Sequence, residues 1–185
     1  MLNAASSTLK CGPAWARTLP EEISTPCFTV YEQGVLDNFF ATAKACGGIE
    51  RLMPHVKTHR AAWIVELLVS EGVRAFKAAT VAETAMVLAA GATYAVWAYP
   101  SANKANIRAL IDAACAYPRA SVGALVDSQS SLATWRDELA AAVKSVRNLK
   151  LIVDLDAGMG RTGAPSTEAL RARDRVKVGS GVRGS

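Results

Sequence analysis

Lys57 lies between the chain's only two histidines, His55 and His59, with one residue separating it from each. Because side chains alternate across a strand, all three point to one face if the extended conformation persists through Thr58. A lysine amine becomes a nucleophile when burial or nearby positive charge lowers its pKa, and with an aldehyde it forms a Schiff base. A lone lysine at a strand end is usually an ordinary surface residue. The clustering of both histidines around Lys57 favours a reactive site in residues 53–59.

A second candidate is the glycine-rich segment 153–163, which begins in an apolar, strand-like run. Its three glycines permit close approach of the backbone to a ligand, and Arg161 offers a planar cation that stays charged. The alternative is a plain strand-to-helix turn with a solvated arginine. Asp154 and Asp156 suggest a metal or acid–base pair, but one of them could equally bond a polar group of a neighbouring strand. We therefore predict no metal site from them.

Short β-like runs alternate with helix-period segments along the chain, which is typical of βα units and a parallel sheet. Five amphipathic helices are predicted; the first stops at Gly47, and the third opens with a capping box formed by Thr80 and Glu83. This order fits an open doubly wound sheet and part of a closed barrel equally well. No G-x-G-x-x-G turn follows the first strand, which disfavours a doubly wound nucleotide binder. The predicted strands are 26–31, 51–57, 74–79, 94–99, 121–127 and 149–156.

The length of 185 residues suffices for one domain but falls short of the ~250 that a complete (β/α)8 barrel needs. The most apolar window, 85–100, is broken by Gly91 and by polar residues, so no transmembrane segment is expected. The N-terminal residues lack the continuous apolar core of a secretory signal. The four cysteines show neither C-x-x-C pairs nor zinc-finger spacing, so disulfides and structural zinc are not predicted. We expect a cytoplasmic location.

The net charge of +5 is concentrated near the C-terminus, where residues 165–185 hold five basic against two acidic residues, a net +3. No basic stripe interleaved with aromatic residues occurs in the rest of the chain, so nucleic-acid binding is not expected. We predict a flexible lead-in over residues 1–24, a folded domain over 25–164 and a basic, disordered tail over 165–185.

The lysine and glycine segments, in this order and at this separation, resemble the fold type III pyridoxal-phosphate (PLP) enzymes, whose N-terminal barrel is like that of alanine racemase. Within that group the likeness is to the D-threonine aldolase and D-serine dehydratase branch, whose cofactor segment is similar to residues 54–59. The stretches 77–83 and 156–163 also agree, and the likeness runs from about Thr25 to Gly163. It implies an α/β fold, an incomplete TIM-type (β/α)8 barrel of about six strands and five helices.

The resemblance also implies roles for individual residues. Lys57 corresponds to the lysine that forms the Schiff base with PLP. Arg161 corresponds to the arginine that approaches the phenolic oxygen of the cofactor, so Lys57 and Arg161 are the expected cofactor-binding residues. His55 and His59 fall near the reacting carbon, and by the family's logic one of them relays protons.

The function implied by the resemblance is that of a PLP-dependent lyase acting on β-hydroxy-D-amino acids. It is D-threonine-aldolase-like, cleaving the Cα–Cβ bond to give glycine and an aldehyde. Two alternatives stay open: a dehydratase of D-serine or 3-hydroxy-D-aspartate, and a non-catalytic PLP-binding homeostasis protein. The paired histidines favour the lyase, whereas the short length favours the binding protein. The expected partner is a small D-amino acid, with no membrane or nucleic acid, and the full-length form is expected to be a homodimer.

The sequence departs from the family pattern in three places. Met53 stands where the family usually has an arginine, and Arg60 stands where a lysine is common, which keeps the charge. After Gly163 the family continues with further βα units and a C-terminal β-domain, which carries the ligands of a divalent metal. We therefore expect a truncated family member without the β-domain and the metal ligands, a loss that can abolish activity.

Overall fold

The computed structural model describes residues 23–24, 26–27, 29–143 and 146–165. These residues belong to two compact units, which divide between Gly47 and Gly48. Residues 1–22 of the predicted lead-in and 166–185 of the predicted tail lie outside the described residues.

The first unit contains the helix α1, Glu32–Cys46. It ends as predicted at Gly47, whose left-handed backbone (φ 83°) lets its N–H reach the carbonyls of Ala43 and Lys44. The predicted strand 26–31 is not observed among its described residues. Tyr31 is extended (φ −97°, ψ 105°) and serves as the N-cap of α1. An extended segment becomes a strand only where a neighbouring strand supplies ladder hydrogen bonds.

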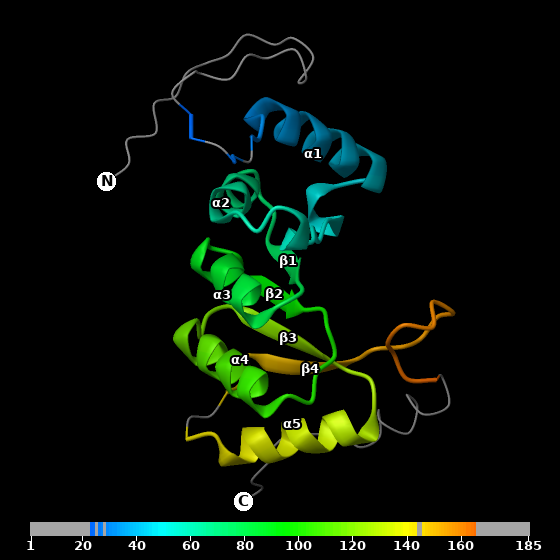
Figure 1. Cartoon of the computed structure of the whole chain (residues 1–185). Helices are drawn as coiled ribbons and strands as arrows, with labels where there is room; N and C mark the ends of the chain where they lie inside the picture. The colour runs from blue at the N-terminus through cyan, green and yellow to red at the C-terminus, as the bar shows by residue number, and fades with distance from the viewer. Residues whose placement is uncertain (1–22, 25, 28, 144–145, 166–185) are drawn as a thin grey trace, which may run out of the picture. The chain divides into compact units, whose positions relative to one another are not determined.

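The second unit alternates helices with parallel strands. Its sheet has the order β1-β2-β3-β4, so each strand pairs with the next one in the chain (Figure 1). A parallel neighbour requires a crossover, and α3, α4 and α5 supply the three crossovers. The elements are η2 (Ile49–Arg51), η3 (Val56–Thr58), α2 (Ala62–Ser70), β1 (Ala75–Ala78), α3 (Val81–Ala89), β2 (Tyr94–Trp97), α4 (Lys104–Ala116), β3 (Ser121–Val126), α5 (Gln129–Ala141) and β4 (Leu149–Val153).

One face of this sheet forms the core together with the helices. Phe76 of β1 lies in register with Ala95 of β2, and both are buried. Trp97 lies two residues further along β2 and makes a T-shaped contact with Trp135 of α5, with 6.4 Å between the ring centroids. This contact identifies the face that the helices cover. Lys77 points to the opposite face and is exposed.

The strand order and the helix positions decide between the two fold classes that the sequence left open. A doubly wound sheet reverses its strand order and carries helices on both faces. Here the order runs in one direction, α3 packs on β1 and β2, and α4 packs against α3 and α5. The predicted α/β fold class, an incomplete TIM-type barrel, is confirmed.

Residues 51–57, predicted to be a strand, contain one isolated bridge between two 3-10 turns. His55 bridges Lys77 of β1 in parallel, and the Lys77 N–H donates to the Pro54 carbonyl at 2.8 Å. Pro54 has no N–H of its own to give to a ladder, so the pairing does not extend along this segment. The described residues of 26–31 belong to no strand either, so the described part of the chain forms four strands where six were predicted.

Candidate active site

The turn that carries Lys57, η3, lies at the carboxyl edge of the sheet. Its N-cap, His55, is in register with Lys77, the last residue but one of β1, and the turn continues beyond that point. Active sites of β/α barrels are assembled from the loops at this edge. The structure thus places Lys57 where such a fold positions its chemistry.

The backbone around Lys57 is a 3-10 turn. The Lys57 N–H donates to His55 Nδ1 at 3.3 Å, and the N–H groups of His59 and Arg60 donate to the Val56 carbonyl at 3.2 and 2.8 Å. Val56 is fully buried, so an apolar side chain anchors the turn. The expectation that His55, Lys57 and His59 alternate onto one face of an extended segment is wrong, because a 3-10 turn repeats every three residues.

Both imidazoles accept a main-chain N–H at Nδ1. His55 accepts from Lys57, and His59 accepts from Ala61 at 3.1 Å. A neutral ring that accepts at Nδ1 carries its proton on Nε2. Burial lowers the pKa of both rings, and the positive charge of Lys57 lowers the pKa of His55 further. At neutral pH two neutral rings therefore accompany Lys57, each with an Nε2–H.

The Lys57 amine is not committed to any other group. The residue is exposed, and its side chain forms no hydrogen bond or ion pair within the part of the chain that the structure describes. By contrast, the Lys104 amine lies 3.8 Å from a carboxylate oxygen of Glu138. An amine without a partner, once it has lost its proton, can attack a carbonyl group without first breaking an interaction.

Arg60 and Glu83 lie beside the turn, and sequence reasoning did not identify either as a site residue. Arg60 Nε lies 3.0 Å from Glu83 Oε1, and Glu83 Oε2 accepts the Ala79 N–H at 2.7 Å. The negative charge of Glu83 raises the pKa of both His55 and His59, against the larger effect of burial. These contacts bring Glu83 into the candidate site.

The capping box at the start of α3 is the sequence signal that could have found Glu83. The Thr80 hydroxyl accepts the Glu83 N–H at 3.1 Å, as predicted, while the Glu83 carboxylate reaches the N–H of Ala79 and not that of Thr80. A helix that follows a strand of a barrel begins at the carboxyl edge. A carboxylate in its first turn therefore lies close to the active edge of the sheet.

The glycine-rich segment forms a loop after β4 whose two ends are joined. The Ala164 N–H donates to the Asp154 carbonyl at 2.9 Å, and the Asp156 N–H donates to the Ala164 carbonyl at 3.2 Å. Gly163 has a φ of 106°, and a Cβ there would collide with the backbone of Leu155 and Asp156. Gly163 therefore allows two backbone segments to approach each other, which is a structural role.

Asp156 also has a structural role in this loop. Its carboxylate accepts the N–H groups of Gly158 at 2.9 Å and Gly160 at 3.1 Å, and these donors lower the pKa of Asp156. The two amides are therefore already bonded and do not point at a ligand in this conformation.

Arg161 is exposed in the same loop and forms no ion pair with any described residue. It lies at the carboxyl edge, as Lys57 does, but its loop follows β4 (orange in Figure 1), whereas the Lys57 turn lies beside β1. β2 and β3 lie between β1 and β4. The structure thus brings His55, Lys57 and His59 together at one turn, and no hydrogen bond or ion pair among the described residues joins Arg161 to that turn.

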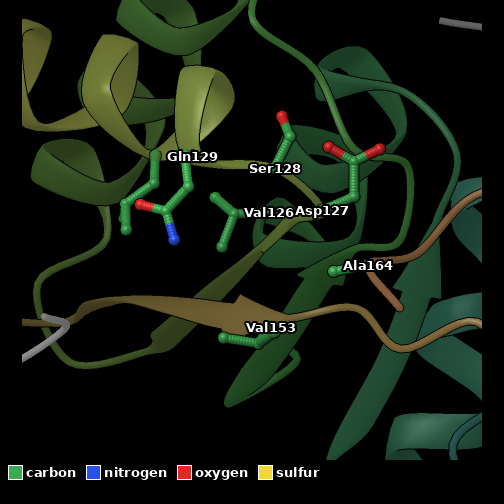
Figure 2. Close-up of a pocket in the computed structure, with 7 residues that line it drawn as sticks. Val126, Asp127, Ser128, Gln129, Val153 and Ala164 are labelled. Atoms are coloured by element: carbon green, nitrogen blue, oxygen red, sulfur yellow. The ribbon is translucent and has the colours of Figure 1, made fainter. Parts of the chain in front are cut away.

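A small cavity lies at the carboxyl ends of β3 and β4. Its volume of ≈ 10 Å³ gives room for about one water molecule, which is too little for an amino acid or PLP. None of the three residues at the Lys57 turn lines it. Figure 2 shows the residues around it: Val126 and Val153 from the strands, Ala164 from the glycine-rich loop, and Asp127, Ser128 and Gln129 at the start of α5.

In the described ranges of the chain, no three His, Cys, Asp or Glu side chains are grouped so that they could hold a metal ion. Cys27, Cys46 and Cys115 are free thiols. Within the same ranges, no helix combines the length and the apolar character that a bilayer crossing demands.

Comparison with known proteins identifies the family. The profile of the alanine racemase N-terminal domain matches residues 33–184. No curated protein sequence matches the chain. Among solved structures, the D-threonine aldolase from Filomicrobium marinum is similar in fold, with a TM-score of 0.67 and 21% identity over 83% of this chain; the chain spans 40% of that aldolase. The chain belongs to the alanine racemase N-terminal domain family, a group of fold type III PLP enzymes.

Proposed function

We propose that this protein is a PLP-dependent lyase of β-hydroxy-D-amino acids that cleaves the Cα–Cβ bond to give glycine and an aldehyde. The observation that carries the proposal is the uncommitted Lys57 amine beside two neutral imidazoles at the carboxyl edge of the sheet. Membership of the family supports PLP as the cofactor. The similarity in fold to a D-threonine aldolase supports the lyase class.

The Lys57 turn fits PLP at the aldehyde end of the cofactor. The exposed amine of Lys57 has no partner among described residues, and the buried Val56 holds the turn that presents it. Arg161, an uncommitted cation, is proposed to contact the phenolic oxygen. When bound, PLP supplies an electron sink for the carbanion left by bond cleavage.

His55 and His59 are proposed to hold and donate protons at Nε2. Their Nδ1 atoms accept main-chain N–H groups, so each ring is arranged as a proton donor. Such a donor suits the step in which the α-carbon takes up a proton. For either ring to act instead as a base at Nε2, its proton must move to Nδ1, which breaks the bond to the main chain.

Several finer parts of the proposal come from the sequence alone. A dehydratase of D-serine or 3-hydroxy-D-aspartate is the alternative with the same cofactor, and a PLP-binding homeostasis protein is the alternative without catalysis. A homodimer in the full-length form and a cytoplasmic location remain proposals, and so does a divalent metal in full-length relatives, whose ligands this chain is expected to lack. So do the boundaries of the lead-in (1–24), the barrel domain (25–164) and the tail (165–185).

The cofactor part is tested by titrating the purified chain with PLP and recording the visible absorbance band that lysine-bound PLP gives. We expect the band in the wild type and in Lys77→Ala, which removes another exposed lysine next to His55, and we expect its loss in Lys57→Ala. A wild-type chain without the band would refute the proposed cofactor role.

The lyase part is tested by supplying D-threonine and D-serine with PLP and a divalent metal. Glycine and acetaldehyde from D-threonine support the aldolase. Ammonia with 2-oxobutanoate or pyruvate indicates a dehydratase instead. Binding of PLP without turnover of either substrate contradicts lyase activity of this chain and supports either the binding protein or a truncated, inactive lyase.

A further inference from the structure

Glu83 is a buried acid to which the proposed chemistry gives no role. Its residue is only 5% exposed, and a carboxylate removed from water is costly unless it is paired and hydrogen-bonded. Both of its oxygens are committed: Oε1 to the Arg60 guanidinium at 3.0 Å and Oε2 to the Ala79 N–H at 2.7 Å. These two partners lie on different elements, so Glu83 joins them.

Arg60 is the partner on the side of the Lys57 turn. Its N–H closes the turn on the Val56 carbonyl at 2.8 Å. Its φ of 49° makes it the one non-glycine residue with a left-handed backbone in the described part of the chain. Such a conformation persists only where the surroundings hold it, and the contact with Glu83 is one of these restraints.

Ala79 is the partner on the side of the sheet, because it directly follows β1. The entry of the Lys57 turn is already joined to β1 through the bridge between His55 and Lys77. Glu83, in the first turn of α3, joins the exit of the turn to the end of the same strand. The turn is therefore attached to β1 at both ends.

We propose that Glu83 is the positioning residue of the candidate site: through Arg60 and Ala79 it fixes the exit of the Lys57 turn against β1 and so fixes where the lysine amine stands. The inference rests on the proposed function, which makes the position of that amine important. Glu83 also acts on the histidines by its charge. The charges of Lys57, Lys77 and Glu83 all act on His55, and the charge of Glu83 acts on His59.

The test compares Glu83→Gln and Arg60→Ala with a matched control, Arg108→Ala. Arg108 Nε lies 2.6 Å from the carboxylate of Glu138, which is again a buried acid paired with an exposed arginine, but this pair joins α4 to α5. Neither member acts on the two histidines. The control therefore reports the general effect of losing such a pair.

Two measurements need no cofactor. Hydrogen exchange at the amides of residues 59 and 60, both bonded to the Val56 carbonyl, should become faster in Glu83→Gln and Arg60→Ala and stay unchanged in Arg108→Ala. NMR titration of the chain's two histidines should show a lower pKa for both rings in Glu83→Gln, since a negative charge that favours the protonated form has been removed.

A third measurement uses PLP. The rate at which borohydride fixes PLP on Lys57 should fall by on the order of tenfold in Glu83→Gln, because a displaced amine meets the aldehyde less often in a reactive geometry. If Glu83→Gln fails to fold, Arg60→Ala decides, since the Arg60 side chain is 68% exposed. The proposal would be overturned if Glu83→Gln and Arg60→Ala showed the same amide exchange rates, the same histidine titration and the same rate of PLP fixation as the wild type. A wild-type chain that never fixes PLP on Lys57 ends the proposed function instead, and the two cofactor-free measurements still decide the role of Glu83.

Discussion

The backbone of Arg60 has an unfavourable conformation, which costs the candidate site conformational free energy. Its φ of 49° lies in the left-handed region, which costs an L-residue about 1–2 kcal/mol. The Arg60 side chain is 68% exposed, so water screens its charge, whereas the Glu83 carboxylate is buried and depends on its partners. The ion pair therefore orders the turn and also compensates a buried charge.

A comparison of Arg60→Gly with Arg60→Ala separates the effect of backbone strain from the effect of losing the side chain. Both remove the guanidinium, but only glycine adopts a positive φ without strain. We expect Arg60→Gly to be more stable than Arg60→Ala by about 1 kcal/mol in urea unfolding. Equal stabilities of the two variants would show that residue 60 is not held in the left-handed region.

At the scale of elements, local patterns predicted the helices well and the first strands poorly. The Gly47 stop and the Thr80 cap both define helix ends in the structure, because each depends on neighbours in the sequence. Segment 51–57 has a strand-like apolar pattern, but Pro54 has no N–H to donate to a strand ladder. An apolar pattern takes no account of this missing hydrogen bond. A sheet segment also needs a partner, which lies elsewhere in the chain.

In the candidate site, too, the sequence predicted the local features and missed those that depend on contacts between elements. The spacing of His55, Lys57 and His59 is local, so the sequence pointed to that cluster. The contact between Arg60 and Glu83 joins two elements and has no local signature. The ring nitrogen with which each histidine accepts a main-chain N–H depends on the 3-10 turn, and the expected extended conformation did not predict it.

The glycine-rich loop gives a prediction of pH dependence. Hydrogen bonds from the amides of Gly160 and Gly158 lower the pKa of Asp156 in the folded chain. The ionised carboxylate therefore holds the loop fully above the ordinary pKa of Asp, ~3.9, and this stabilisation is lost as the pH falls through the lowered pKa. The amide chemical shifts of Gly158 and Gly160 should therefore move at acidic pH. Asp156→Ala should abolish this titration, and Asp154→Ala should retain it. Amide shifts that do not change with pH in the wild type would contradict the assigned role.

At the scale of the whole molecule, the covered face of the sheet and its carboxyl edge have separate roles. The covered face holds the core, including Phe76, Trp97 and Trp135. The candidate site lies at the carboxyl edge, where Lys57 and Arg60 are exposed. A β/α fold separates stability from chemistry in this way, so site variants can be compared without loss of the core.

The two core tryptophans give a test of that core. Trp97 Nε1 donates to the Ala79 carbonyl at 3.1 Å, whereas the buried Nε1 of Trp135 has no partner among the residues that the structure describes. Trp97→Phe and Trp135→Phe lose the same volume, but only Trp97→Phe leaves a carbonyl without its donor. We expect Trp97→Phe to cost about 1 kcal/mol more in thermal or urea unfolding. The opposite order of stabilities would contradict this arrangement of the core.

The most direct measurement of the central claim, that Lys57 binds PLP, is to map where the cofactor attaches. The chain is incubated with PLP, reduced with borohydride, digested and analysed by mass spectrometry. We predict that the modification lies mainly on the peptide containing Lys57, persists in Lys77→Ala and disappears from that peptide in Lys57→Ala. Modification spread evenly over the exposed lysines, or concentrated on Lys77, would contradict the account.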